Sequence, residues 1–180
     1  MKNEKINIGI VGCGNIAEKY LDQISSYDNI KLIGLSDIEI DRAKNFSSIY
    51  KCQFYESLDK MLLDENIDLI VNLTIHHAHA EVIEKILTSG KHVYTEKPLA
   101  MNYKDAKRII DISEKRNLRL SSAPITYMGE MQQTAYKKIN DGLLGKIRLV
   151  YAEINHDRIE NWHPNPKPFF DVGVLWDVGI

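Results

Sequence analysis

The residues "INIGIVGCGNIA" (Ile6–Ala17) run from a nonpolar segment through a glycine-rich turn into a segment with helical spacing. Gly12, Gly14 and Ala17 match the pattern G-x-G-x-x-A. In that pattern the first glycine permits a tight turn, the second lets the backbone approach a pyrophosphate, and the small third residue lets the helix pack close to the sheet. The helix N-terminus then offers N–H groups to the phosphates. We therefore expect a dinucleotide to be bound by Gly12, Gly14, Asn15 and Ile16.

A carboxylate follows the next nonpolar segment, "IKLIGLS" (Ile30–Ser36). Asp37 stands about 20 residues beyond the glycines, at the end of a predicted strand, where an acid can bind the ribose 2′-OH of the adenosine. The alternative is that Asp37 only caps the next helix. A carboxylate repels the 2′-phosphate of NADP, so the sequence favours NAD as cofactor. Arg42, one helical turn further on, leaves NADP possible.

The same alternation of nonpolar strands and helix-period segments continues to residue 123. This pattern predicts an α/β fold, a Rossmann-type doubly wound parallel sheet with helices on both faces, over residues 1–123. Beyond residue 123 the pattern changes to one helix ending at Gly142, an alternating strand over Lys146–Asp157 and a loop with three prolines in "NWHPNPKPFF". We interpret residues 124–180 as the beginning of an incomplete α+β domain that binds substrate and forms oligomers.

Composition excludes several other classes of protein. The net charge is −2 and the basic residues are scattered, so we expect no nucleic-acid partner. The two cysteines, Cys13 and Cys52, lack metal-ligand spacing, which argues against a metal site and fits the cytoplasm. The N-terminus lacks the features of a signal peptide, and no nonpolar run reaches the roughly 18 residues of a membrane-spanning helix.

A second polar group follows the fifth predicted strand, in "VYTEKPLAM" (Val93–Met101). Glu96 and Lys97 stand at the strand end, on the sheet edge that also carries the glycine turn, and Pro98 follows them. A lysine in this position can reach a substrate hydroxyl. The alternative is an ordinary solvated lysine after a strand.

Four segments resemble the Gfo/Idh/MocA family of oxidoreductases, and together they cover nearly the whole chain. They are "GIVGCGNIA", "NLTIHHAHAEVIEKILTSG", "GKHVYTEKPLA" and "INDGLLGKIRLVYAE". The resemblance implies an NAD(P)-dependent oxidoreductase acting on a sugar, cyclitol or related polyol. It further implies that Lys97 contacts the substrate hydroxyl and the nicotinamide, that Glu96 lies near the nicotinamide ribose, and that the Lys97–Pro98 peptide bond is cis. It also implies that the cofactor cleft is lined by Thr74 and His79. For His79, a packing or capping role is the alternative.

The resemblance also reaches the C-terminal part of the chain. Asp177 matches the first residue of a D-x-x-x-H motif whose histidine acts as acid or base in many members, and that position would be residue 181. We therefore interpret the chain as part of a longer, homo-oligomeric enzyme and expect these 180 residues alone to be inactive. Candidate substrate contacts are Tyr127, Trp162 and His163. Two other functions stay open, namely a nucleotide-binding regulator without turnover and an NAD-dependent glycosidase.

Overall fold

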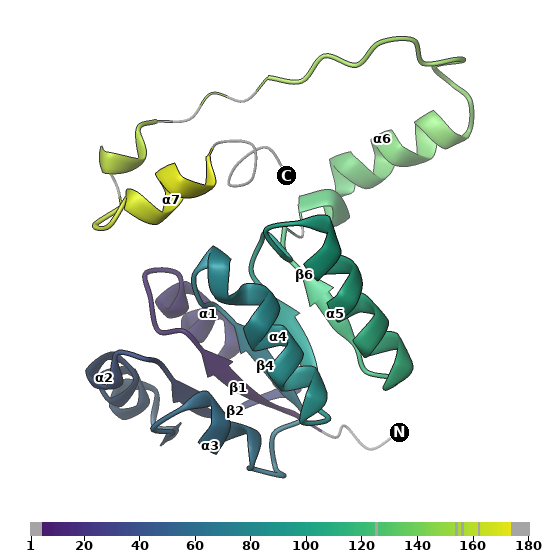
Figure 1. Cartoon of the computed structure of the whole chain (residues 1–180). Coiled ribbons are helices and arrows are strands. Elements are labelled where there is room, and N and C mark those ends of the chain that lie inside the picture. Colours follow the sequence, from purple (N-terminus) through teal and green to yellow (C-terminus); the bar gives the residue numbers. More distant parts are fainter. Residues whose placement is uncertain (1–4, 125, 154, 156, 162, 174–180) are drawn as a thin grey trace. The chain divides into compact units, whose positions relative to one another are not determined.

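A computed structural model describes residues 5–124, 126–153, 155, 157–161 and 163–173 of the 180-residue chain. The chain divides into two compact units, Met1–Ala123 and Pro124–Ile180. All strands of the described residues belong to the first unit (Figure 1). The candidate site residues of the sheet edge therefore belong to this unit.

The first unit alternates strands and helices along the chain. Its strands are β1 (Ile6–Val11), β2 (Ile30–Ser36), β3 (Gln53–Phe54), β4 (Leu69–Asn72), β5 (His92–Thr95) and β6 (Leu120–Ser122). Its helices are α1 (Ala17–Ile24), α2 (Ile40–Tyr50), α3 (Leu58–Leu62), α4 (His79–Thr88) and α5 (Tyr103–Lys115), with a 3-10 turn, η1 (His76–Ala78), before α4.

The six strands form one parallel sheet in the order β3-β2-β1-β4-β5-β6. From β1 the chain builds the sheet outward to β3, crosses back, and builds the other half from β4 to β6. The border between β1 and β4 is therefore a topological switch point, where open α/β sheets bind their ligands. The predicted Rossmann-type doubly wound sheet is confirmed.

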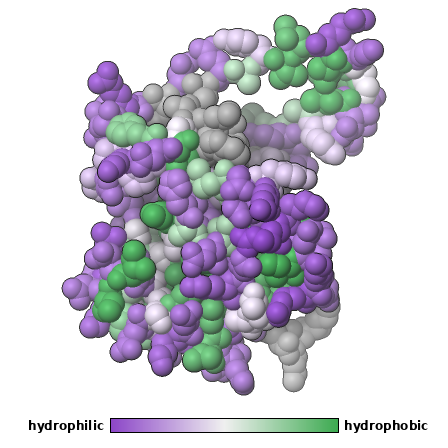
Figure 2. Space-filling model, in the orientation of Figure 1, coloured by the Kyte–Doolittle hydropathy of each residue, from purple (hydrophilic) through white to green (hydrophobic). Residues whose placement is uncertain are grey.

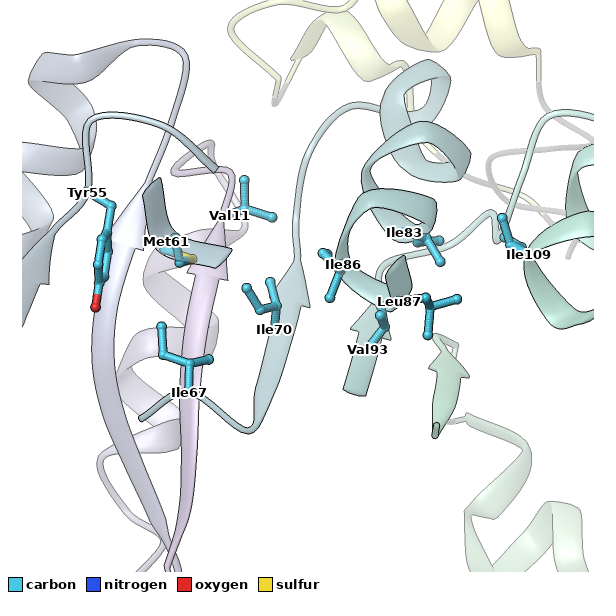
Figure 3. Packing of buried hydrophobic residues seen from close by; sticks show 10 residues of the cluster. All are labelled: Val11, Tyr55, Met61, Ile67, Ile70, Ile83, Ile86, Leu87, Val93 and Ile109. Carbon is cyan, nitrogen blue, oxygen red and sulfur yellow. The ribbon is translucent and has the colours of Figure 1, made fainter. Parts of the chain in front are cut away.

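Two hydrophobic clusters cover the two faces of the sheet, because side chains alternate along each strand. On β1, Ile8 and Ile10 join the cluster that includes Ala17 and Leu21 of α1, whereas Val11 joins the opposite cluster. The opposite cluster draws on α3, α4 and α5 and is shown in Figure 3. Its buried members are Val11, Tyr55, Met61, Ile67, Ile70, Ile83, Ile86, Leu87, Val93 and Ile109.

Local signals in the sequence set several helix ends. The Ser57 side chain accepts the N–H of Lys60 at 3.2 Å and caps α3. Asn102 caps α5 by accepting the N–H of Asp105 at 2.9 Å. Gly90 has a φ of 88° just beyond α4, a backbone conformation that favours glycine after a helix.

The second unit contains η2 (Thr126–Met128), α6 (Glu130–Asn140), η3 (Ile159–Asn161) and α7 (Lys167–Val172). The prediction of a strand over Lys146–Asp157 is wrong for the described residues of that range, which contain no strand. Alternating side chains favour a strand only where a neighbouring strand supplies backbone partners. The prediction of a loop throughout "NWHPNPKPFF" is also wrong. Proline is tolerated in the first turn of a helix, and α7 begins there.

The second unit exposes many nonpolar side chains. Leu149 is 86% exposed and Tyr151 83% exposed, and α6 has no buried residue. Hydrophobic side chains gather at the end of α6 and in the segment that follows it (Figure 2). These side chains are therefore exposed within this chain taken by itself.

Candidate cofactor-binding site

Three segments leave the sheet side by side at the carboxyl ends of its central strands. Val11 of β1 pairs with Asn72 of β4, and Asn72 pairs with Thr95 of β5. The glycine turn, the segment leading to α4 and the Glu96–Pro98 segment are therefore neighbours at the switch point. This shared edge is the candidate site.

The glycine turn has the shape that a dinucleotide requires. Gly12 has a φ of 97°, and a Cβ added there would lie 2.5 Å from the carbonyl carbon of Leu73, so a larger residue does not fit. A Cβ added at Gly14 would meet no atom within 4 Å, so the backbone there faces open space. A tight first glycine and an open second one fit the approach of a pyrophosphate.

The start of α1 follows this turn directly. Ala17 is fully buried against the sheet, and its N–H donates to the carbonyl of Gly14 at 3.0 Å. Asn15 is exposed and Ile16 is half-buried, so both lie at the accessible end of the helix. The turn therefore presents the positive end of the α1 dipole to the open side of Gly14.

Asp37 joins the end of β2 to the glycine turn. One carboxylate oxygen accepts the N–H of Cys13 at 2.5 Å, and the other accepts the N–H of Glu39 at 2.7 Å. The side chain is only 9% exposed. An ionised carboxylate has about four lone-pair positions, so both oxygens can accept a further ribose hydroxyl.

The Cys13 thiol is buried beside Asp37, and these surroundings raise its pKa. Burial is the main cause, and the neighbouring Asp37 carboxylate the next, of the rise in the pKa of Cys13 to about 12. The thiol is 2% exposed and lies 3.8 Å from the carbonyl oxygen of Ser36. Cys13 is therefore a packing residue of the turn and lacks the exposure and thiolate character of a nucleophile.

The Glu96 carboxylate is held on two sides. One oxygen accepts the hydroxyl of Tyr20 at 2.6 Å, and the other accepts the N–H of Lys97 at 3.1 Å. The backbone N–H of Glu96 donates to the carbonyl of Asn72 at 3.0 Å. Burial raises the pKa of Tyr20, and the hydrogen bond to Glu96 raises it further. Tyr20 lies on α1, so this contact joins the glycine-turn helix to the Glu96–Pro98 segment.

Lys97 stands next in the chain and is half-buried. The Lys97–Pro98 peptide bond is cis, which confirms the prediction from the resemblance. Pro98 is buried and its carbonyl oxygen meets the ring of His79. A cation, a carboxylate and a phenol hydroxyl are thus gathered at the end of β5. Such a group can bind and polarise a hydroxyl-bearing ligand.

His79 opens α4 and is 1% exposed. Its Nδ1 lies 2.6 Å from the carbonyl oxygen of Pro98, and its Nε2 lies 2.9 Å from the carbonyl oxygen of Thr74. A carbonyl oxygen can only accept a hydrogen bond and a neutral imidazole carries one N–H, so the ring donates to one of these oxygens and packs against the other. This geometry favours the packing role of His79 over direct lining of the cofactor cleft.

Thr74 and Asn72 shape the segment between β4 and α4. The amide oxygen of Asn72 accepts both the N–H of Thr74, at 3.2 Å, and its hydroxyl, at 2.7 Å. Asn72 is fully buried, and its Nδ2 has no hydrogen-bond partner in the part of the chain that the structure describes. The Thr74 hydroxyl is thus directed to Asn72, while Thr74 itself stays half-buried at the edge.

Sequence reasoning missed Tyr20 and Asn72. The available signal for Tyr20 was its position, since it is a tyrosine in the first turn of the helix that follows the glycine turn. Its acceptor stands 76 residues away, and only the fold brings the two together. Asn72, a polar residue at the end of an otherwise nonpolar strand, offered a comparable signal.

The other predicted site residues belong to the second unit. Tyr127 is 58% exposed in η2. His163 is half-buried, its Nδ1 accepts the N–H of Asn165 at 3.1 Å, and its ring contacts Phe169 edge to face. Trp162 and Asp177 lie outside the described residues.

Among the described residues, no group of three or more His, Cys, Asp or Glu side chains is placed to hold a metal ion. No helix in that part of the chain has the length and nonpolar character needed to cross a membrane.

Comparison with known proteins places this geometry in context. A family model, GFO_IDH_MocA, described as an oxidoreductase family with an NAD-binding Rossmann fold, matches residues 6–123. An uncharacterized oxidoreductase of Schizosaccharomyces pombe is 33% identical over 69% of this chain and 34% of its own length. Myo-inositol 2-dehydrogenase of Thermotoga maritima is 23% identical over 97% of this chain and 52% of its own length.

Solved structures share the fold. The WlbA dehydrogenase of Bordetella pertussis, in complex with NADH and UDP-GlcNAcA, has a TM-score of 0.74 and 26% identity, covering 79% of this chain and 45% of its own. A 3-ketoreductase of Actinomadura kijaniata, KijD10, in complex with NADP, has a TM-score of 0.72 and 25% identity, covering 81% and 47%. The chain thus spans about half or less of the length of these relatives.

Proposed function

Since this chain belongs to the Gfo/Idh/MocA family of oxidoreductases with an NAD-binding Rossmann fold, we propose that the protein transfers a hydride between NAD and a hydroxyl-bearing carbon of a sugar, cyclitol or related polyol. The position of Lys97 carries the proposal. Lys97 stands between two anchored neighbours, Glu96 and Pro98, at the strand end beside the glycine turn.

We propose that the adenosine half of the cofactor is bound by the glycine turn and Asp37. The open side of Gly14 receives the pyrophosphate, and the buried Asp37 carboxylate receives the ribose hydroxyls. Asp37 and the acidic Glu39 beside it disfavour a 2′-phosphate, which supports NAD over NADP. Arg42 is exposed on α2 and is the residue through which NADP would be accommodated.

The residues of the β5 edge then act on the substrate. The bound nicotinamide supplies hydride uptake or release. Lys97 holds the substrate hydroxyl and stabilises the charge that develops on its oxygen as the proton leaves. Glu96 lies near the nicotinamide ribose, and Thr74 lines the cleft beside it. Asp177 belongs to the acid-base group that exchanges the proton.

The second unit is proposed to contribute substrate contacts and an oligomer interface. The names of the relatives support a sugar-like substrate, since one is a myo-inositol dehydrogenase and another was solved with UDP-GlcNAcA. In this proposal Tyr127, Trp162 and His163 contact the substrate, and the exposed nonpolar side chains around Leu149 and Tyr151 are covered in a homo-oligomer. A cytoplasmic location is proposed because Cys13 and Cys52 are both free thiols.

The intact protein tests the proposal through NADH formation with a panel of myo-inositol, hexoses and UDP-linked sugars. Lys97→Met removes the charge and keeps the length of the side chain. We expect it to slow hydride transfer by about 100-fold in stopped flow, the loss typical of one electrostatic donor in a transition state, with nearly unchanged NAD affinity.

Lys104→Met is the matched control, because Lys104 is an exposed lysine on α5. We expect it to keep the wild-type rate. A wild-type rate in Lys97→Met would make Lys97 a structural residue, and an intact protein that binds NAD but oxidises nothing in the panel would favour the nucleotide-binding regulator.

A further inference from the structure

Tyr20 occupies a position between the two halves of the candidate site. It lies on α1, the helix whose first turn faces the open side of Gly14, and its hydroxyl donates to the Glu96 carboxylate at 2.6 Å. Glu96 follows β5, and 76 residues separate the two partners in the sequence. One hydrogen bond therefore connects the phosphate end of the site with the end that carries Lys97.

The surroundings of Tyr20 hold this contact in place. Its ring packs against Tyr94 with the ring centres 6.2 Å apart, and the side chain is half-buried. Burial raises the pKa of Tyr20, so the phenol keeps its proton and acts as a donor throughout the neutral range. A donor to an ionised carboxylate makes a stronger hydrogen bond than a neutral pair does.

The remaining contacts of Glu96 leave Tyr20 as the side chain that orients it. Within the part of the chain that the structure describes, the second carboxylate oxygen accepts the backbone N–H of the adjacent Lys97, at 3.1 Å, a contact made by a chain neighbour. On the far side of Lys97, the carbonyl of Pro98 is fixed by the ring of His79 at 2.6 Å. The lysine segment is thus bound on one side by α4 and on the other by α1.

We propose that Tyr20 is a positioning residue that orients Glu96 and, through it, the nicotinamide half of the cofactor site. This inference rests on the proposed function, in which Glu96 lies near the nicotinamide ribose. It requires that the effect of Tyr20 pass through Glu96 and be confined to the nicotinamide end. A purely structural role for Tyr20 would instead weaken every ligand of α1 equally.

Calorimetric titration of the intact protein with NADH and with ADP separates these roles, because ADP lacks the nicotinamide and its ribose. We expect Tyr20→Phe, which keeps the ring contact with Tyr94, to weaken NADH about fivefold and to change ADP affinity by less than about twofold. Glu96→Ala should weaken NADH at least as much. The double variant should bind NADH no more weakly than Glu96→Ala, since coupled residues are not additive.

Tyr50→Phe is the matched control. Tyr50 also donates to a carboxylate on α1, that of Asp22, over the same 2.6 Å, but this hydrogen bond involves no residue of the β5 edge. We expect it to leave both affinities unchanged. Equal losses of NADH and ADP in Tyr20→Phe, additive losses in the double variant, or an unchanged NADH affinity would each overturn the inference.

The outcomes also separate this inference from the proposed function. An intact protein that shows the expected NADH and ADP pattern but transfers no hydride overturns the enzyme proposal and supports the role of Tyr20 in binding. If the wild type transfers hydride and Tyr20→Phe binds NADH with wild-type affinity, the enzyme proposal stands and the role of Tyr20 is overturned. Failure of the wild type to bind NADH overturns both.

Discussion

The carboxylate of Asp37 accepts the backbone N–H of Cys13 at 2.5 Å, so the acid at the end of β2 is bonded directly to the glycine turn after β1. Its other oxygen accepts the N–H of Glu39, at the start of α2. Asp37 therefore fixes the turn as well as presenting a carboxylate. A single substitution there changes both the shape and the charge of the adenosine end.

Asp37→Ala should weaken NAD about tenfold and NADP clearly less. In the variant the glycine turn is no longer fixed by Asp37, which weakens the binding of both cofactors. Only NAD also loses a hydrogen bond to its ribose, whereas for NADP a repulsion between Asp37 and the 2′-phosphate disappears. Calorimetry with both cofactors measures the difference. Asp41→Ala, at an exposed acid in the first turn of α2, is the control and should change neither affinity. Equal losses for the two cofactors would count against Asp37 as the discriminating residue.

The two glycines of the turn should respond differently to alanine. Gly12→Ala should lower the free energy of unfolding by about 3 kcal/mol, because its φ is 97° and the new Cβ would lie 2.5 Å from the Leu73 backbone. Gly14→Ala should leave stability nearly unchanged, because nothing lies within 4 Å of that Cβ. It should still weaken NADH, since the methyl group would occupy the space of the pyrophosphate. Urea unfolding and NADH titration of both variants check this, and similar stability losses would contradict it.

His79→Phe should destabilise the first unit by about 1–3 kcal/mol, because it keeps a buried ring but removes the ring N–H that the carbonyl oxygen of Pro98 or of Thr74 accepts. His79→Gln keeps one donor and should recover part of the loss. His77→Phe, at an exposed neighbour, is the control. If the midpoint of urea unfolding were the same in His79→Phe and in the wild type, the contacts of the His79 ring would not contribute to stability.

The Cys13 thiol should make stability depend on pH in the alkaline range. Its pKa is raised from the ordinary 9.0 to about 12, so the folded state keeps a proton that the unfolded state gives up. The resulting stabilisation is fully present below pH 9 and is lost as the pH rises toward about 12. In urea unfolding the free energy should therefore fall less steeply above pH 9 in Cys13→Ala than in wild type. Parallel curves for the two proteins would refute this assignment.

The first unit could be predicted well because its signals are local. Nonpolar strands separated by helix-period segments predicted the parallel sheet, and Ser57 and Asn102, which cap α3 and α5, are residue types that favour helix N-termini. The spacing of Gly12 and Asp37, each just after a predicted strand, indicated that both lie at the same edge of the sheet. Each of these inferences needs only neighbouring residues and the right-handed connection of parallel strands.

The contacts that the sequence did not predict are long-range or involve the backbone. The acceptors of His79 are main-chain carbonyls, which every residue possesses, so no pattern marks them. Lys91 is 7% exposed because its ammonium donates to the carbonyls of Asp64 and Ile67 at 2.7 and 2.9 Å. The prediction of a strand over Lys146–Asp157 was wrong for a related reason. Alternating side chains indicate a strand but do not identify the neighbouring strand with which it would pair.

The pairing of β1 with β4 has a consequence for the order in which the protein is made. Ile8 pairs with Leu32 on one side and with Leu69 on the other, and Gly12 packs against the backbone of Leu73 and Thr74. A chain leaving the ribosome can form the β1–β2 pair early, because that pairing closes a short loop. The glycine turn meets its packing partner only after translation has passed residue 74. Nascent chains shorter than this should therefore contain the β1–α1–β2 unit without any affinity for NADH.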